Sequence, residues 1–148
     1  MTTTERIDDL FERAQIAFHD HLGAGAMIYL RKTFEMTTAQ AAVATGIETK
    51  RSSGKRKDFK SLLAEVDARS HIIPSEFSTN GYKLFSELSE VIHGESNEAH
   101  ALSKFRPCRR LVFGIVNNIR NNQDMAEAIA SLGWNVTMPL NSTERAPV

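Results

Sequence analysis

The polar side chains that can take part in chemistry are concentrated in one segment, residues 86–110 of the 148-residue sequence. His93 and His100 lie in this segment, with Asn97 between them and several carboxylates beside them. An imidazole exchanges protons near neutral pH and can therefore act as a general acid or base. We take His93 and His100 as candidate catalytic residues. The alternative, that both imidazoles only line or cap a helix junction, stays open.

Basic side chains follow the two histidines along a segment with helical spacing. Lysine and arginine contact phosphates through their charge, with an affinity that depends on salt and not on base sequence. This segment therefore indicates a surface for RNA or another phosphate ligand. The candidate ligand-binding residues are Arg31, Asn97, Lys104, Arg106, Arg109 and Arg110. In the opposing interpretation, the basic helix simply pairs with the acidic stretch at residues 61–100.

A second basic cluster lies at residues 50–60, within a stretch rich in lysine, arginine, serine and glycine. Such a composition is typical of an exposed loop. We expect a flexible arm there, which either contacts phosphates or is only solvated.

The sequence favours neither a metal nor a cofactor. Glu90 and His93 have the i, i+3 spacing of di-iron bundles, but that site needs a second Glu-x-x-His pair, which the sequence lacks. His19 and His21 flank an aspartate, yet adjacent helical residues project about 100° apart and cannot share one ion. No phosphate-binding glycine loop or nucleophile motif is present.

Composition indicates a single domain of ordinary type. The formal net charge is zero and 41% of the residues are hydrophobic, so a chain of this size can bury a core without metal or disulfide. Neither a signal peptide nor a membrane span is recognisable, and we expect a cytoplasmic protein without membrane association. The one cysteine, Cys108, is expected in the core, although the arginines around it leave open a lowered thiol pKa.

Hydrophobic periodicity close to 3.6 residues predicts helices along nearly the whole chain. The first predicted helix carries an apolar stripe at residues 7–18. The other predicted helices cover residues 24–44, 58–69, 80–94, 97–120 and 125–132. Thr2 and Glu5 have the spacing of a capping box, Asn80 is a plausible N-cap, and Gly46 can end the second helix. A strand at residues 111–116 is the weaker alternative.

Two features near the end of the chain limit the helices. Pro107 predicts a kink or a break near Arg106, so two helices are possible where one is drawn. Gly133 is a plausible residue just beyond the last helix, with Trp134 as its hydrophobic contact. The expected fold is all-α: an antiparallel bundle of about five to six helices in one domain, residues 1–138, followed by a flexible tail at 139–148.

Two stretches resemble a known family. Residues 25–35, GAMIYLRKTFE, look like the second helix of a bacterial helical domain of unknown function, found beside restriction and defence systems, within the HEPN superfamily (higher eukaryotes and prokaryotes nucleotide-binding). Its members carry an apolar run, then Leu-Arg-Lys, then a hydrophobic-Glu pair. Residues 85–94, FSELSEVIHG, are similar to a later helix that ends in a Ser-x-x-x-His-Gly turn. With the helix order, the similarity spans roughly residues 5–120.

The resemblance implies a HEPN-like bundle that often forms a homodimer and occurs in defence and toxin–antitoxin proteins. Active members are metal-independent endoribonucleases with an arginine and a histidine separated by roughly four to six residues at the dimer interface. The histidine moves a proton and the arginine stabilises charge on the phosphate. Neither His93 nor His100 has an arginine at that spacing, whereas Arg13 and His19, on an early helix, do.

Three functions remain as hypotheses. The first is a non-catalytic or weakly catalytic HEPN-like module that self-associates and contacts RNA or another phosphate ligand near His93. The second is a scaffold or regulatory subunit that binds a protein partner through a helical face. The third is a metal-independent RNase, in which Arg13 acts with His19, or a turn histidine acts with an arginine such as Arg31 or Arg106.

Overall fold

The computed structural model describes residues 2–76, 81–90 and 98–134. Within these residues the chain forms five α-helices and no strand, which confirms the predicted all-α bundle. The helices are α1 (Thr3–His19), α2 (Gly23–Ala44), α3 (Phe59–Ser70), α4 (Gly81–Ser89) and α5 (Glu98–Ser131). The predicted cap at Asn80 and the tail at 139–148 lie outside the described residues.

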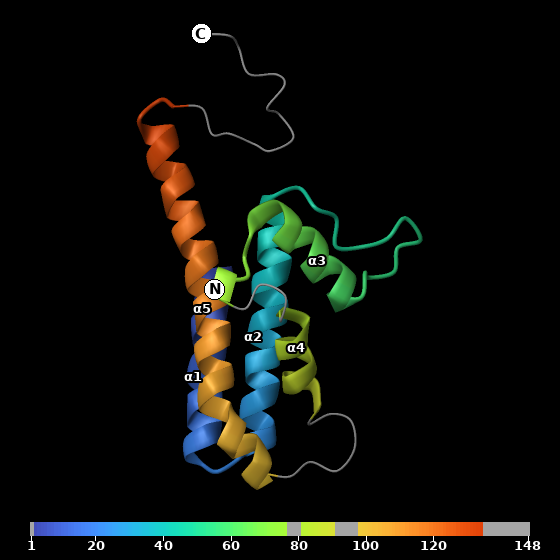
Figure 1. Ribbon diagram of the computed structural model, residues 1–148, viewed down its shortest axis with the longest axis vertical. Coiled ribbons are helices and arrows are strands. Elements are labelled where there is room, and N and C mark those ends of the chain that lie inside the picture. Colours follow the sequence, from blue (N-terminus) through green and yellow to red (C-terminus); the bar gives the residue numbers. More distant parts are fainter. Residues whose placement is uncertain (1, 77–80, 91–97, 135–148) are drawn as a thin grey trace.

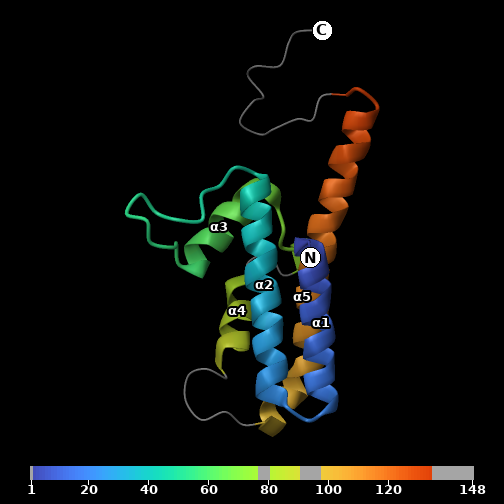
Figure 2. The same ribbon diagram turned by 180° about the vertical axis from the view of Figure 1, so that it is seen from behind.

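The two longest helices, α2 and α5, run side by side in the same direction (Figure 1). Their neighbours α1 and α4 run the opposite way and flank α2 on opposite sides, as both views show (Figure 2). The short helix α3 lies beside the C-terminal half of α2. The bundle is therefore antiparallel between α1 and α2, as expected, but parallel between α2 and α5.

Small residues allow the first turns of α2 and α5 to approach closely. A Cβ atom added to Gly23 would lie 2.6 Å from the carbonyl oxygen of Glu98 and 2.9 Å from the Cβ of Ala101. Ala26 of α2 and Ala101 of α5 are both buried in the core near this contact. The glycine at the start of α2 is thus required by the packing of two helix backbones.

The helix starts are capped in different ways. The predicted capping box of α1 is present: Glu5 N–H donates to the Thr2 hydroxyl at 3.1 Å, and Thr2 N–H donates to the Glu5 carboxylate at 2.8 Å. α2 has no side-chain cap of its own, because Leu22 stands at its N-cap position. Instead the Glu98 carboxylate, from the start of α5, accepts a hydrogen bond from Ala24 N–H at 3.0 Å. One end of the bundle is therefore tied together by a shared cap.

Of the kink or break predicted near Arg106, the break is wrong, because α5 continues through Pro107 as one helix. Proline removes the amide that would bond to the carbonyl of Ser103. Both residues are exposed, so water can reach that carbonyl. Phe105 and Cys108, on the opposite side of the helix, are buried. The parts of α5 before and after Pro107 therefore pack against the same core.

The predicted separate helix at residues 125–132 is also wrong, because residues 121–124 are helical and join it to α5. Asparagine lowers helix propensity when its side chain competes for backbone groups. Here the Asn118 and Asn122 carboxamides bond instead to carbonyls at the end of α3. The helix ends at Ser131, and Gly133 follows with a φ of 74°. Trp134, predicted to make a hydrophobic contact there, is 64% exposed.

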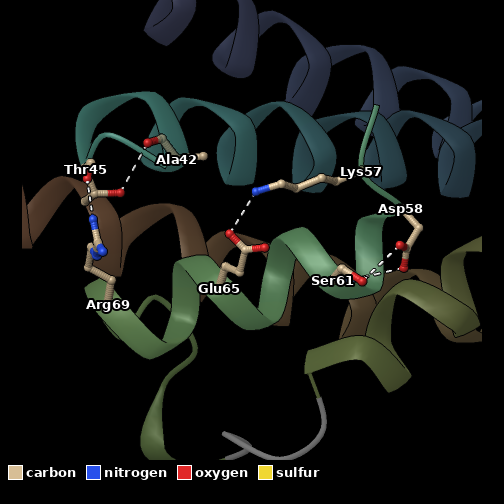
Figure 3. Close-up of polar contacts among 7 residues, drawn as sticks. All are labelled: Ala42, Thr45, Lys57, Asp58, Ser61, Glu65 and Arg69. Carbon is tan, nitrogen blue, oxygen red and sulfur yellow. Dashed lines mark hydrogen bonds and ion pairs between the residues drawn. The ribbon is translucent and has the colours of Figure 1, made fainter. Parts of the chain in front are cut away.

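The basic loop between α2 and α3 is exposed, as predicted, and projects from the bundle (Figure 1). Lys50 and Arg56 form an antiparallel bridge. Two of its cations are paired: Arg51 lies 3.0 Å from Asp58, and Lys57 lies 2.9 Å from Glu65 (Figure 3). Asp58 also accepts a hydrogen bond from Ser61 N–H and so caps α3.

The end of α3 is fixed to the end of α2. Arg69 donates a hydrogen bond to the Thr45 carbonyl at 3.1 Å (Figure 3). Gly46 follows with a φ of 75°, the left-handed conformation predicted for it. Along the described ranges, no helix is both long and apolar enough to cross a membrane.

Candidate functional site

The structure divides the predicted ligand-binding residues among three environments, which are set by the sides of α2 and α5 that carry them. Asn97 and the candidate catalytic His93 lie outside the described residues.

Lys104 lies on the side of α5 that faces α4. Its ammonium group contacts the Glu87 carboxylate and lies 3.7 Å from Glu90. The hydrogen bond with Glu87 raises the pKa of Lys104. Its charge is therefore neutralised within the bundle, and we no longer regard it as a ligand-binding residue.

Arg31 lies between α2 and α4. The centre of its guanidinium lies 5.0 Å from the centre of the Phe85 ring, and its Nε lies 3.6 Å from the Glu35 carboxylate. Leu30 and Phe34, which flank it in sequence, are fully buried. The segment that carries the family resemblance is thus occupied with packing, and Arg31 does not join the other arginines.

Arg106 and Arg109 lie on the side of α5 that faces α1, stacked on phenylalanine rings. The Arg106 guanidinium lies 5.5 Å from the centre of the Phe18 ring. The Arg109 guanidinium lies 5.6 Å from Phe11 and 5.7 Å from Phe113, two rings that meet edge to face. These cation–π contacts hold both guanidinium groups in a defined position on the surface.

Arg110 completes this surface, one helical turn after Arg106. None of the described carboxylates lies within ion-pair distance of Arg106, Arg109 or Arg110. Asp8, an acid on α1, is held by Arg120 at 2.8 Å. We name this surface the arginine face, comprising Arg106, Arg109 and Arg110 with Phe11, Phe18 and Phe113.

Of the described histidines, His19 adjoins the arginine face, because its ring centre lies 5.8 Å from that of Phe18. His100 is exposed in the first turn of α5. Nine residues separate it from Arg109, and at about 100° per residue the two side chains leave the helix on opposite sides. Arg13 and His19 also diverge: Arg13 pairs with Asp9 at 2.8 Å, whereas His19 contacts Gln15 at 3.0 Å. The arginine that lies on the same ring as His19 is therefore Arg106 and not the sequence-predicted Arg13.

Cys108 is 5% exposed and belongs to the core, as predicted. Burial, with a further contribution from Glu87, raises the pKa of its thiol to about 11. The alternative of a thiol activated by the neighbouring arginines is therefore wrong. These arginines extend away from the buried sulfur toward α1 and solvent.

A groove that sequence reasoning missed lies between the C-terminal parts of α2, α3 and α5. It has a volume of about 1110 Å³. Asn118 donates hydrogen bonds to the carbonyls of His71 and Ile72 at 2.8 and 3.0 Å, and Asn122 donates to Ser70 at 3.2 Å. The signal in the sequence was the run NNIRNNQ at residues 117–123, which repeats asparagine at the four-residue spacing of one helix face.

In the part of the chain that the structure describes, no group of three histidine, cysteine or acidic side chains is placed to hold a metal ion. The chain matches no family model, and no curated protein or solved structure is significantly similar to it.

Proposed function

We propose that the protein is a non-catalytic, HEPN-like RNA-binding module that holds a single strand on the arginine face. The observation that carries the proposal is the position of Arg109, fixed between Phe11 and Phe113 without a described carboxylate to neutralise it. A preorganised guanidinium loses little conformational freedom when it binds a phosphate.

The composition of the arginine face supports RNA as the ligand. Arginines supply contacts to the backbone phosphates, and Phe113, which is 41% exposed beside Arg109, offers a ring on which a base can stack. Single-stranded nucleic acids are bound by this combination of cations and aromatic rings. Membership of the HEPN superfamily, self-association as a homodimer and a cytoplasmic location are parts of the same proposal.

The test is fluorescence anisotropy of a labelled 12-nucleotide polyuridine at several salt concentrations. We expect Arg109→Gln and Arg110→Gln each to weaken binding by about tenfold and to reduce the slope of log K against log salt by about 0.7. Arg110 is exposed, so its substitution leaves the fold intact. Arg13→Gln is the matched control, because it removes the same charge from an arginine paired with Asp9.

Three outcomes contradict the proposal: no binding, binding that does not depend on salt, or an equal loss in Arg13→Gln. A denaturing gel of the same RNA in chelator tests the absence of catalysis. Cleavage that is lost in His93→Ala, His100→Ala or His19→Ala would replace the proposal by the RNase hypothesis.

A further inference from the structure

The groove between α2, α3 and α5 has chemistry unlike that of the arginine face and lies on the other side of α5. We name it the amide groove. Nine residues separate Arg109 from Asn118, so the two side chains leave α5 about half a turn apart. The apolar part of the lining is formed by Ala41, Ala44, Ile72, Ile73, Pro74, Gly114, Ile119 and Ala126. Its polar part is formed mainly by asparagines of α5 and by the segment that follows α3.

The asparagines present hydrogen-bond acceptors at a regular spacing. Their NH₂ groups are already used, because Asn118 and Asn122 donate to carbonyls of residues 70–72. In the described ranges, no protein donor bonds to their carboxamide oxygens. Four residues along a helix rise about 6 Å, and alternate N–H groups of an extended peptide are about 6.6 Å apart. The spacing of Asn118 and Asn122 along α5 therefore matches the repeat along one edge of an extended backbone.

The charge of the lining selects the side chains of such a peptide. Asp67, Glu76 and His71 line the groove, and no lysine or arginine is among its described lining residues. One Asp67 oxygen accepts a hydrogen bond from Ile73 N–H at 2.8 Å, which leaves the other oxygen for a ligand. Two carboxylates attract basic side chains and repel phosphates. The Ser70 hydroxyl also lines the groove, and its oxygen is buried without a hydrogen-bond partner in the described structure.

The lining of the groove combines apolar side chains, such as those of Ile72, Ile73 and Pro74, with the acids Asp67 and Glu76. Successive side chains of an extended peptide point to opposite sides, so one set can contact the apolar residues and the other set the acids.

We propose that the amide groove binds an extended, basic peptide segment of a protein partner. The Asn118 and Asn122 oxygens accept hydrogen bonds from alternate backbone N–H groups of the peptide. The Asp67 and Glu76 carboxylates face its lysine or arginine side chains. This proposal is independent of RNA binding, because it uses none of the residues of the arginine face.

The test is a titration of the ¹⁵N-labelled full chain, followed through the side-chain amide signals of Asn118 and Asn122. One probe is an octapeptide pool with lysine at every second position and an equal mixture of alanine, leucine, serine and valine elsewhere. The second pool has glutamate in place of lysine. We expect the lysine pool to shift both signals and to bind at least about tenfold more tightly than the glutamate pool.

Variants place the binding in the groove. Ala126→Phe puts a ring into the groove beyond the last buried residue of α5, and we expect at least a tenfold loss of affinity. Ala128→Phe is the matched control, on the exposed opposite side of the same helix, and should bind like the wild type. Glu76→Gln, at an exposed position, should weaken binding of the lysine pool severalfold. The ratio of affinities for the lysine pool and the glutamate pool should therefore fall.

Several results would overturn the proposal: no shift with the lysine pool, equal binding of both pools, or full binding by Ala126→Phe. Shifts at Asn118 and Asn122 caused by polyuridine would assign the groove to nucleic acid. Shifts that grow with protein concentration in the absence of peptide would assign it to a second copy of the chain.

Discussion

The thiol of Cys108 is held in its protonated form by its surroundings. Burial and Glu87 raise its pKa from 9.0 to about 11, so the unfolded chain loses this proton at a lower pH than the folded chain. The contribution of this thiol to the free energy of unfolding is fully present below pH 9 and is lost as the pH rises toward 11. A shift of this size corresponds to about 2–3 kcal/mol.

We therefore expect the difference in unfolding free energy between the wild type and Cys108→Ala to fall by about 2 kcal/mol between pH 9 and pH 11. Urea unfolding of both proteins at several pH values measures this difference, and titration of Lys104 and other groups cancels in it. Native Cys108 should also resist iodoacetamide at pH 8 and react after unfolding. A difference that does not change with pH would contradict the assigned burial.

Individual residues of the candidate site could be found from the sequence, but their environments could not. Lys104, Arg106, Arg109 and Arg110 lie within two turns of one helix and read as a single basic cluster. Their roles differ because α4 contributes Glu87 on one side and α1 contributes Phe11 and Phe18 on the other. Which helix lies on which side of α5 is a property of the tertiary fold, and the hydrophobic periodicity of the sequence does not predict it.

At the scale of elements, the approach of α2 to α5 gives a pair of substitutions with opposite signs. Gly23→Ala places a Cβ 2.6 Å from the Glu98 carbonyl oxygen, so the helix backbones must separate, and we expect a loss of about 1–3 kcal/mol. Gly25→Ala, two residues later, has only a 3.9 Å contact with Leu22. There the higher helix propensity of alanine should stabilise the fold by up to about 1 kcal/mol.

Chemical denaturation of the two alanine variants measures both effects. If Gly23→Ala were as stable as Gly25→Ala, the close packing at the first turns of α2 and α5 would be disproved.

The shared cap gives a third variant, since Glu98→Ala removes the acceptor for Ala24 N–H and should lower the free energy of unfolding by about 1 kcal/mol.

The elements that depend on local signals were predicted well. The capping box at Thr2 and the stop at Gly46 both act within a few residues. α5 was predicted as two helices, residues 97–120 and 125–132, with a kink or a break near Arg106 because proline fits poorly inside a helix. Its continuity depends on distant groups: the carbonyls at residues 70–72 that bind Asn118 and Asn122.

At the scale of the whole molecule, α5 extends beyond the rest of the bundle. Ile119 is its last buried residue, although the helix continues to Ser131 (Figure 1). A helical segment of about 12 residues is only marginally stable without packing. The end of α5 therefore opens locally, while the part from Phe105 to Ile119 opens only when the core unfolds.

Hydrogen exchange followed by NMR tests this difference. We expect the amides of residues 124–131 to exchange at least about a hundredfold faster than those of residues 108–119. Binding of the lysine peptide pool should slow exchange near Ala126. Uniform protection along α5 would mean that its end is covered by another surface.

The end of α5 also carries the only tryptophan of the chain, Trp134, whose side chain is 64% exposed. Its indole lies in water in the folded protein, so its emission should be red-shifted and quenched by iodide before any denaturation. Core unfolding barely changes the surroundings of this ring and must be followed by circular dichroism instead. Trp134 emission is then a built-in optical reporter of whatever comes to rest against the end of α5.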